Sequence, residues 1–127
     1  MSANLDENRV TLSVPARTDH LHLLRLNVAA IAGSKFGIDE VEDVKIAVEE
    51  LAAALVRIDG ADPVLHVEVI ANDRLLTVTG RRVLRGQQPS ELEDFVSTIL
   101  EAVVDRHAFD TVGDELRFHI EKDVSER

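Results

Sequence analysis

Residues 10–56 read VTLSVPARTDHLHLLRLNVAAIAGSKFGIDEVEDVKIAVEELAAALV and contain the patterns that decide the fold. Val10, Leu12 and Val14 alternate with polar residues, which is the period of a β-strand, and Pro15 ends that strand. The apolar residues that follow recur at steps of three and four, which is the period of an amphipathic helix. The spacing predicts two successive helices with the apolar positions Leu21, Leu24, Val28 and Ile31, and then Val41, Val44, Val48, Leu51 and Leu55.

Capping residues set the expected limits of these two helices. Thr18 is a favourable N-cap, and Gly33 and Gly37 follow the last apolar position of the first helix. The second helix is expected to begin near Asp39 and to stop before Gly60.

The middle of the chain predicts a hairpin. Residues 64–70 alternate as a strand does, residues 72–73 (Asn-Asp) are a turn signal, and residues 75–79 form the return strand. Residues 80–88 are expected to form a loop that carries the basic residues Arg81, Arg82 and Arg85.

The last third predicts one helix and two strands. Pro89 and Ser90 are expected to open the helix, because proline and serine are common at a helix start. Its apolar stripe would be Phe95, Ile99, Ala102 and Val103, and two strands would follow at residues 107–111 and 116–120.

The expected order is therefore β-α-α-β-β-α-β-β. Helices do not alternate with every strand, so the order argues against a doubly wound parallel sheet. We expect an α/β two-layer sandwich of the α+β type, with a mostly antiparallel sheet and helices on one face. Residues 1–127 are predicted to be a single domain, with flexible ends at 1–8 and 123–127.

The composition narrows the classes of function. The chain has 14 basic and 24 acidic residues and a net charge of −10, which disfavours nucleic acid and membrane surfaces and suits a basic protein partner. Solubility alone would explain the same charge. There is no cysteine, so disulfides and thiolate zinc sites are excluded, and the spacing of the histidines indicates no metal site. The polar N-terminus and the lack of a long apolar run lead us to expect a cytoplasmic protein.

The second predicted helix has a second group of apolar residues around a carboxylate. Ile46, Ala47, Ala53 and Ala54 surround Glu50 on a helical projection. A carboxylate among apolar side chains is a candidate general base. The alternative is that Glu50 is solvated and that the alanines are present because alanine favours helices.

Residues 10–56 resemble the N-terminal half of the RsbW and SpoIIAB-type anti-sigma-factor serine kinases. The similar features are the opening strand that ends in Pro15-Ala16, the Leu-Leu-Arg segment that ends at Arg25, and residues 42–50, EDVKIAVEE. The resemblance implies the histidine-kinase-like (GHKL, Bergerat) ATPase fold, and the order of the later elements extends it to residues 9–122.

The nucleotide motifs of that family are incomplete in this sequence. The family has a Glu that acts as general base and, four residues later, an Asn that holds Mg²⁺; here Glu50 matches the Glu, but Ala54 stands in place of the Asn. Alanine has no oxygen to offer a hard cation.

The two glycine motifs are also missing. The family's Asp-x-Gly-x-Gly motif has no counterpart at Gly80. Where a glycine pair normally opens the last helix, Pro89 lacks an N–H and Glu91 would repel phosphate. We therefore expect no cofactor, and regard Glu50 as a vestigial candidate base.

The resemblance places the partner-binding surface on the first helix. The family's sigma-contacting arginine matches Arg25, and His22 and Asn27 could flank it. An arginine beside an apolar stripe is a good interface anchor, although it could also extend along the edge of the core.

The predicted function is an anti-sigma-factor-like regulator that binds and sequesters a sigma factor as a homodimer, with an anti-sigma antagonist as a second partner. The alternative is an active serine/threonine kinase that uses ATP and Mg²⁺ to phosphorylate such an antagonist. A domain that has left sigma regulation is a third interpretation.

Overall fold

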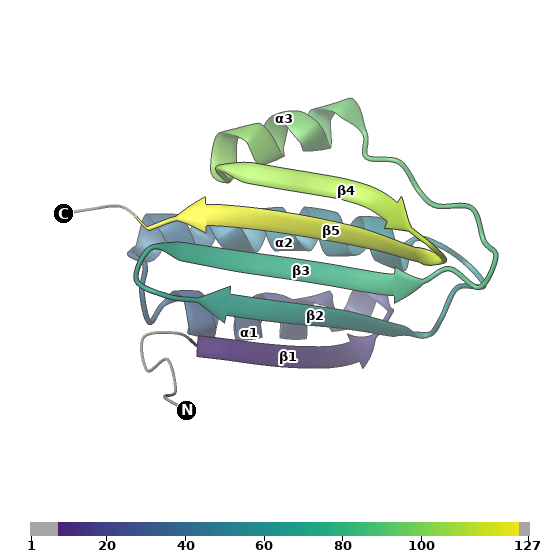
Figure 1. Ribbon diagram of the computed structural model, residues 1–127, viewed down its shortest axis with the longest axis horizontal. Helices are drawn as coiled ribbons and strands as arrows, with labels where there is room; N and C mark the ends of the chain where they lie inside the picture. Colours follow the sequence, from purple (N-terminus) through teal and green to yellow (C-terminus); the bar gives the residue numbers. More distant parts are fainter. Residues whose placement is uncertain (1–7, 125–127) are drawn as a thin grey trace.

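A five-stranded antiparallel sheet forms one layer of the molecule, and helices form the other (Figure 1). The structure is a computed structural model that describes residues 8–124. Its elements are β1 (Asn8–Pro15), a 3-10 turn (Thr18–His20), α1 (Leu21–Ala32), α2 (Ile38–Val56), β2 (Val64–Ala71), β3 (Leu75–Val83), α3 (Asp94–Val103), β4 (Arg106–Val112) and β5 (Glu115–Asp123).

The strands lie in the order β1-β2-β3-β5-β4, and every neighbouring pair is antiparallel. Helices α1 and α2 lie behind the sheet, and α3 contacts α2 and β4 (Figure 1). The predicted fold class and element order are confirmed.

Alternation along the strands divides the sheet into a buried face and an open face. Leu65, Val67 and Val69 of β2 are buried, whereas His66 and Glu68 between them are partly exposed. One covered and one solvated face is the usual state of an antiparallel sheet.

The predicted helical stripes pack on the buried face. In α1 the buried residues are Leu24, Val28 and Ala32. In α2 they include Val44, Val48, Leu51 and Leu55, as expected from the sequence. Because the two stripes share the sheet as their partner, α1 and α2 also pack side by side.

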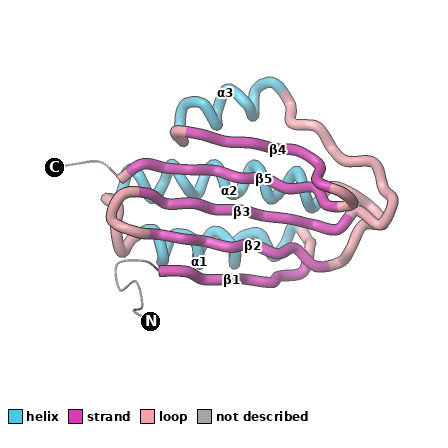
Figure 2. Tube along the Cα trace, viewed as in Figure 1, coloured by secondary structure: helices cyan, strands magenta, loops and turns pink. Residues whose placement is uncertain are grey.

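Strand β3 is longer than the sequence analysis predicted. It continues through Gly80 to Val83, so the connecting loop begins at Leu84 and not at Gly80 (Figure 2). Gly80 lies opposite Phe118 in β5, and a Cβ atom at Gly80 would be 2.1 Å from the Phe118 ring. The glycine is therefore needed for close packing of a core ring within the sheet.

Helix α3 begins at Asp94, five residues later than expected from Pro89. Ser90 does not cap it, because the Ser90 hydroxyl donates to the carbonyl of Ala54 at 2.8 Å. The expected stripe was only partly correct: Val103 packs against the core, but the buried residues are Val96 and Leu100, whereas Phe95 is 58% exposed.

The two ends of the chain and the start of α1 need smaller corrections. Thr18 makes no cap hydrogen bond and begins a 3-10 turn that precedes α1. Asn8 and Asp123, assigned to flexible ends from the sequence, lie in β1 and β5. Residues 1–7 and 125–127 lie outside the described residues. Across residues 8–124, every helix is too short or too polar to cross a membrane.

Candidate partner-binding surface and the end of helix α2

Arg25 faces helix α2 and pairs with one of its carboxylates. Its Nη1 lies 3.2 Å from Oε2 of Glu49, and both side chains are partly exposed. The ion pair joins the outer surfaces of α1 and α2. The guanidinium is thus on the surface, as the sequence predicted, but it already has a partner within the chain.

The three predicted partner-binding residues do not share one face of α1. Arg25 and Asn27 are separated by about 200° around the helix axis, whereas His22 lies one turn from Arg25. The Asn27 amide donates to the carbonyl of Leu23 at 2.7 Å, which ties it to its own helix. His22 is exposed, so His22 and Arg25 can act together and Asn27 faces another direction.

The outer surface carries two apolar residues whose exposure the sequence analysis did not predict. Leu26 is 57% exposed on α1, and Ile46 is 41% exposed on α2. Both are apolar positions outside the buried stripes, and this was the signal available in the sequence. We call the set His22, Arg25, Leu26, Ile46 and Glu49 the α1–α2 surface.

Glu50 is half-buried on the side of α2 that faces α3. It lies two turns after Asp43, and Asp43 pairs with Lys122 at 3.2 Å. Lys122 also donates to the carbonyl of Val103 at the end of α3. The side of α2 that carries Asp43 and Glu50 therefore faces α3. Among the described residues, Glu50 makes no hydrogen bond or ion pair.

Position 54, one helical turn after Glu50, is buried within the fold. Ala54 is fully buried, and its carbonyl oxygen accepts the hydroxyl hydrogen bond from Ser90. The segment that precedes α3 is therefore fastened to the C-terminal half of α2.

Arg82 is buried and holds the end of α2. Its Nε donates to the carbonyl of Asp62 at 2.6 Å, and its Nη1 donates to the carbonyl of Leu55 at 2.7 Å. A further bond reaches the carbonyl of Ala61 at 3.4 Å. Burial lowers the pKa of Arg82, and the charge of Asp62 opposes that shift. The Leu55 carbonyl lies in the last turn of α2, where a helix end leaves acceptors without donors.

The predicted basic cluster does not form, because its members point to different places. Arg82 points into the core side, whereas Arg81 lies on the open face and pairs with Glu115 at 2.9 Å. Nη2 of Arg85 lies 3.8 Å from Oδ1 of Asp62. The prediction failed because residues 81 and 82 are in a strand, where successive side chains point to opposite faces.

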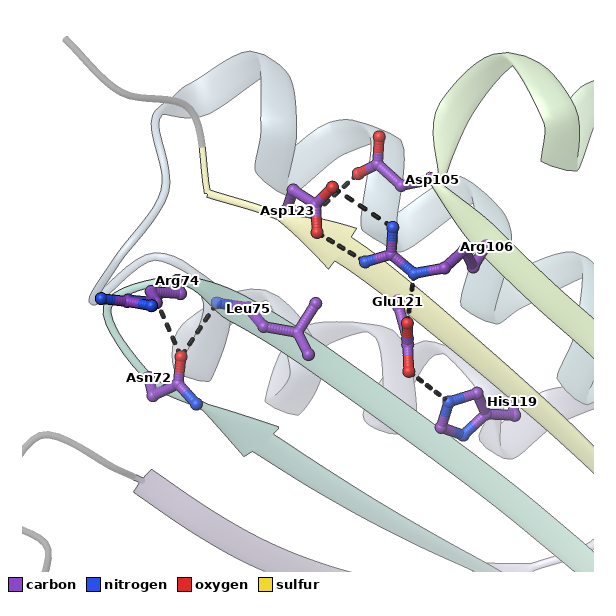
Figure 3. A network of polar contacts seen from close by, with 8 residues as sticks. All are labelled: Asn72, Arg74, Leu75, Asp105, Arg106, His119, Glu121 and Asp123. Carbon is purple, nitrogen blue, oxygen red and sulfur yellow. Dashed lines mark hydrogen bonds and ion pairs between the residues drawn. The ribbon is translucent and has the colours of Figure 1, made fainter.

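The histidines of the open face are held by separate partners. His66 contacts Ser13 at 3.0 Å. His119 contacts Thr79 and Glu121, both at 3.0 Å. Figure 3 shows the connection from His119 through Glu121 to Arg106. No group of three side chains able to ligate a metal occurs among residues 8–124.

Comparison with known proteins gives a match in structure and none in sequence. No family model and no curated protein matches the sequence. The fold matches the crystal structure of the RsbU and RsbW domains of Rv1364c from Mycobacterium tuberculosis, with a TM-score of 0.72 and 13% sequence identity over 94% of this chain. The fold is histidine-kinase-like. The chain spans 33% of the length of that solved chain.

Three segments of the chain meet at the C-terminal end of α2. Ala54 lies in the last turns of α2, Ser90 is bonded to its carbonyl, and Arg82 is bonded to the next carbonyl, that of Leu55. These residues are far apart in the sequence, and the C-terminal end of α2 is where they meet.

Proposed function

We propose that the chain is an anti-sigma-factor-like regulator that binds and sequesters a sigma factor without ATP-dependent kinase activity. The observation that carries the proposal is the likeness of its fold to a structure that contains an RsbW domain. The resemblance of residues 10–56 to the same family supports it independently.

The packing at the end of α2 supports the absence of kinase chemistry. The site of the family's Mg²⁺-holding asparagine is occupied by the fully buried Ala54. Ser90 and Arg82 then use their donors on the helix carbonyls, so these groups are committed to the fold. Magnesium prefers oxygen ligands, and alanine supplies none from its side chain.

The α1–α2 surface is the proposed contact with the sigma factor. It combines exposed apolar side chains, Leu26 and Ile46, with the ion pair of Arg25 and Glu49. Interfaces are commonly anchored by arginine next to apolar area. Release would depend on competing affinities, with an antagonist occupying the same surface, and the regulator would act as a homodimer.

Affinity capture with three baits tests this function. Wild type, Arg25→Ala and the matched control Arg74→Ala, an exposed arginine in the β2–β3 turn, are compared by mass spectrometry. We expect wild type and Arg74→Ala to enrich a sigma factor, and Arg25→Ala to lose at least about tenfold of it. Equal enrichment of that sigma factor by all three baits would remove Arg25 from the contact, and failure to enrich any sigma factor would contradict the function itself.

The second candidate is an active serine/threonine kinase that binds ATP and Mg²⁺. One observation favours it: Glu50 keeps a half-buried carboxylate without a partner among the described residues. Thermal unfolding with and without Mg-ATP decides between the candidates. A nucleotide present at about 100 times its dissociation constant would stabilise the fold by about 2.7 kcal/mol. A shift of that size would favour the kinase, and we expect none.

A further inference from the structure

A groove of about 280 Å³ lies between the segment that precedes α3 and strands β4 and β5. Its apolar lining includes Pro89, Leu92, Phe109 and Leu116, and its polar lining includes Glu91 and Asp110. It is separate from the α1–α2 surface, because α1 and α3 lie at opposite edges of the sheet (Figure 1).

The Glu91 carboxylate beside this groove has no hydrogen bond or ion pair among the described residues. Asp110 follows Phe109 in β4 and is paired with Arg117 in β5, so its side chain points to the open face of the sheet, opposite Phe109. A cation could therefore approach the groove without displacing an existing ion pair.

The charge of the whole segment is of one sign. Residues 88–105 contain five acidic residues and no lysine or arginine. Glu91, Glu93 and Asp94 are exposed within four positions of one another. The segment attracts positive charge, although the same part of the resembling family opens a helix that meets phosphate.

We propose that this groove docks a basic segment of a partner protein. The stem of an arginine or lysine packs against Leu92 and Phe109, while its charged head meets Glu91. The occupant follows from charge complementarity, because an apolar floor beside an unpaired carboxylate, in a segment without lysine or arginine, suits a long cationic side chain and repels an acidic one. The proposal goes beyond the regulator function, since it holds whichever partner occupies the α1–α2 surface.

Titration of the ¹⁵N-labelled full chain with an acetylated hexa-arginine peptide tests the groove. We expect saturable binding, weakened by salt, with amide shifts at residues 90–92 and 109–111. Glu91→Gln should weaken binding about fivefold. Glu101→Gln is the matched control, because it removes the same charge from an exposed position of α3 that does not line the groove, and it should change binding less than about twofold.

Three results would overturn the proposal. The first is no saturable binding up to about 1 mM peptide. The second is an equal loss in Glu91→Gln and Glu101→Gln, which indicates unspecific attraction to a negative protein. The third is a set of shifts on the α1–α2 surface, which places the basic partner there and leaves the regulator function standing. Unchanged circular dichroism of each variant shows that its fold is intact.

Discussion

Arg82 in strand β3 donates a hydrogen bond to the carbonyl oxygen of Leu55 in helix α2, with Nη1 2.7 Å from the oxygen. The same side chain donates through Nε to the carbonyl of Asp62, in the connection that leads to β2. One buried guanidinium therefore joins the sheet, the end of a helix and a loop. The contact joins the C-terminal end of α2 to a residue 27 positions away in the sequence.

Replacement of Arg82 should destabilise the fold strongly. Arg82→Met keeps the apolar stem but leaves the carbonyls of Leu55 and Asp62 without their donor, so we expect a loss of about 2–4 kcal/mol in the free energy of unfolding. Arg81→Met, at the neighbouring position on the open face, is the control and should lose less than about 1 kcal/mol. Urea denaturation measures both, and similar losses would show that the cap is unimportant.

Gly80→Ala should destabilise the fold because the added methyl group would clash with the ring of Phe118. The new Cβ would lie 2.1 Å from the Phe118 ring, so the ring or the strand has to move, at a cost of about 2 kcal/mol or more. The cost should fall in a Phe118→Leu background, where the edge of the ring is absent. A double-mutant cycle by chemical denaturation checks the coupling, and additive effects would contradict the clash.

Placing the asparagine of the resembling family at position 54 should not create nucleotide binding. Ala54→Asn introduces an amide at a fully buried position, so we expect a loss of about 1–3 kcal/mol and no stabilisation by Mg-ATP. The control Ala53→Asn lies at a partly exposed neighbour and should lose about 0.5 kcal/mol from helix propensity. A rise in Tm with Mg-ATP in the Ala54→Asn variant would show that one side chain was the whole defect.

Arg25→Ala should separate binding from stability. Its pair with Glu49 is partly exposed, and exposed ion pairs contribute about 0.2–1 kcal/mol. We expect the Tm to change little while capture of the partner is lost. If thermal unfolding shows a drop as large as that of Arg82→Met, the role of Arg25 is structural.

Glu121→Gln should lower stability at neutral pH more than at acid pH. Arg106, by hydrogen bonding, and then His119 hold the pKa of Glu121 below its usual value of 4.5 (Figure 3). A lowered folded-state pKa stabilises the protein above the unfolded-state pKa, and this contribution disappears as the pH falls through the folded-state value. Urea denaturation at about pH 7 and about pH 3 should show the difference between wild type and variant shrinking. A difference that does not change with pH would contradict an ionised Glu121 as its source.

Most of the fold could be predicted from periodicity. The helical stripe of Val44, Val48, Leu51 and Leu55 and the alternation of β2 were confirmed, because each depends on a local repeat that burial enforces. The predicted start of α3 was wrong because the Ser90 hydroxyl donates to the carbonyl of Ala54 in α2. No local sequence pattern indicates that contact.

The candidate site was predicted less completely. Arg25 is at the surface as expected, but its pairing with Glu49 depends on how α1 packs against α2. The exposed apolar positions Leu26 and Ile46 were visible as residues outside the stripes. The sequence did not predict that they would lie near that ion pair, because residues of two helices come together only after both helices have packed on the sheet.

The sequence by itself determined the element order and the antiparallel two-layer architecture, since these depend on residue types at fixed local spacings. The tertiary structure decided where individual side chains lie. Arg82 changed from a supposed surface charge to a buried helix cap, and Phe95 from a supposed core residue to an exposed ring. The physical reason is that a side chain's direction depends on the register of its strand or helix, and a shift of one residue in a strand reverses the face it meets.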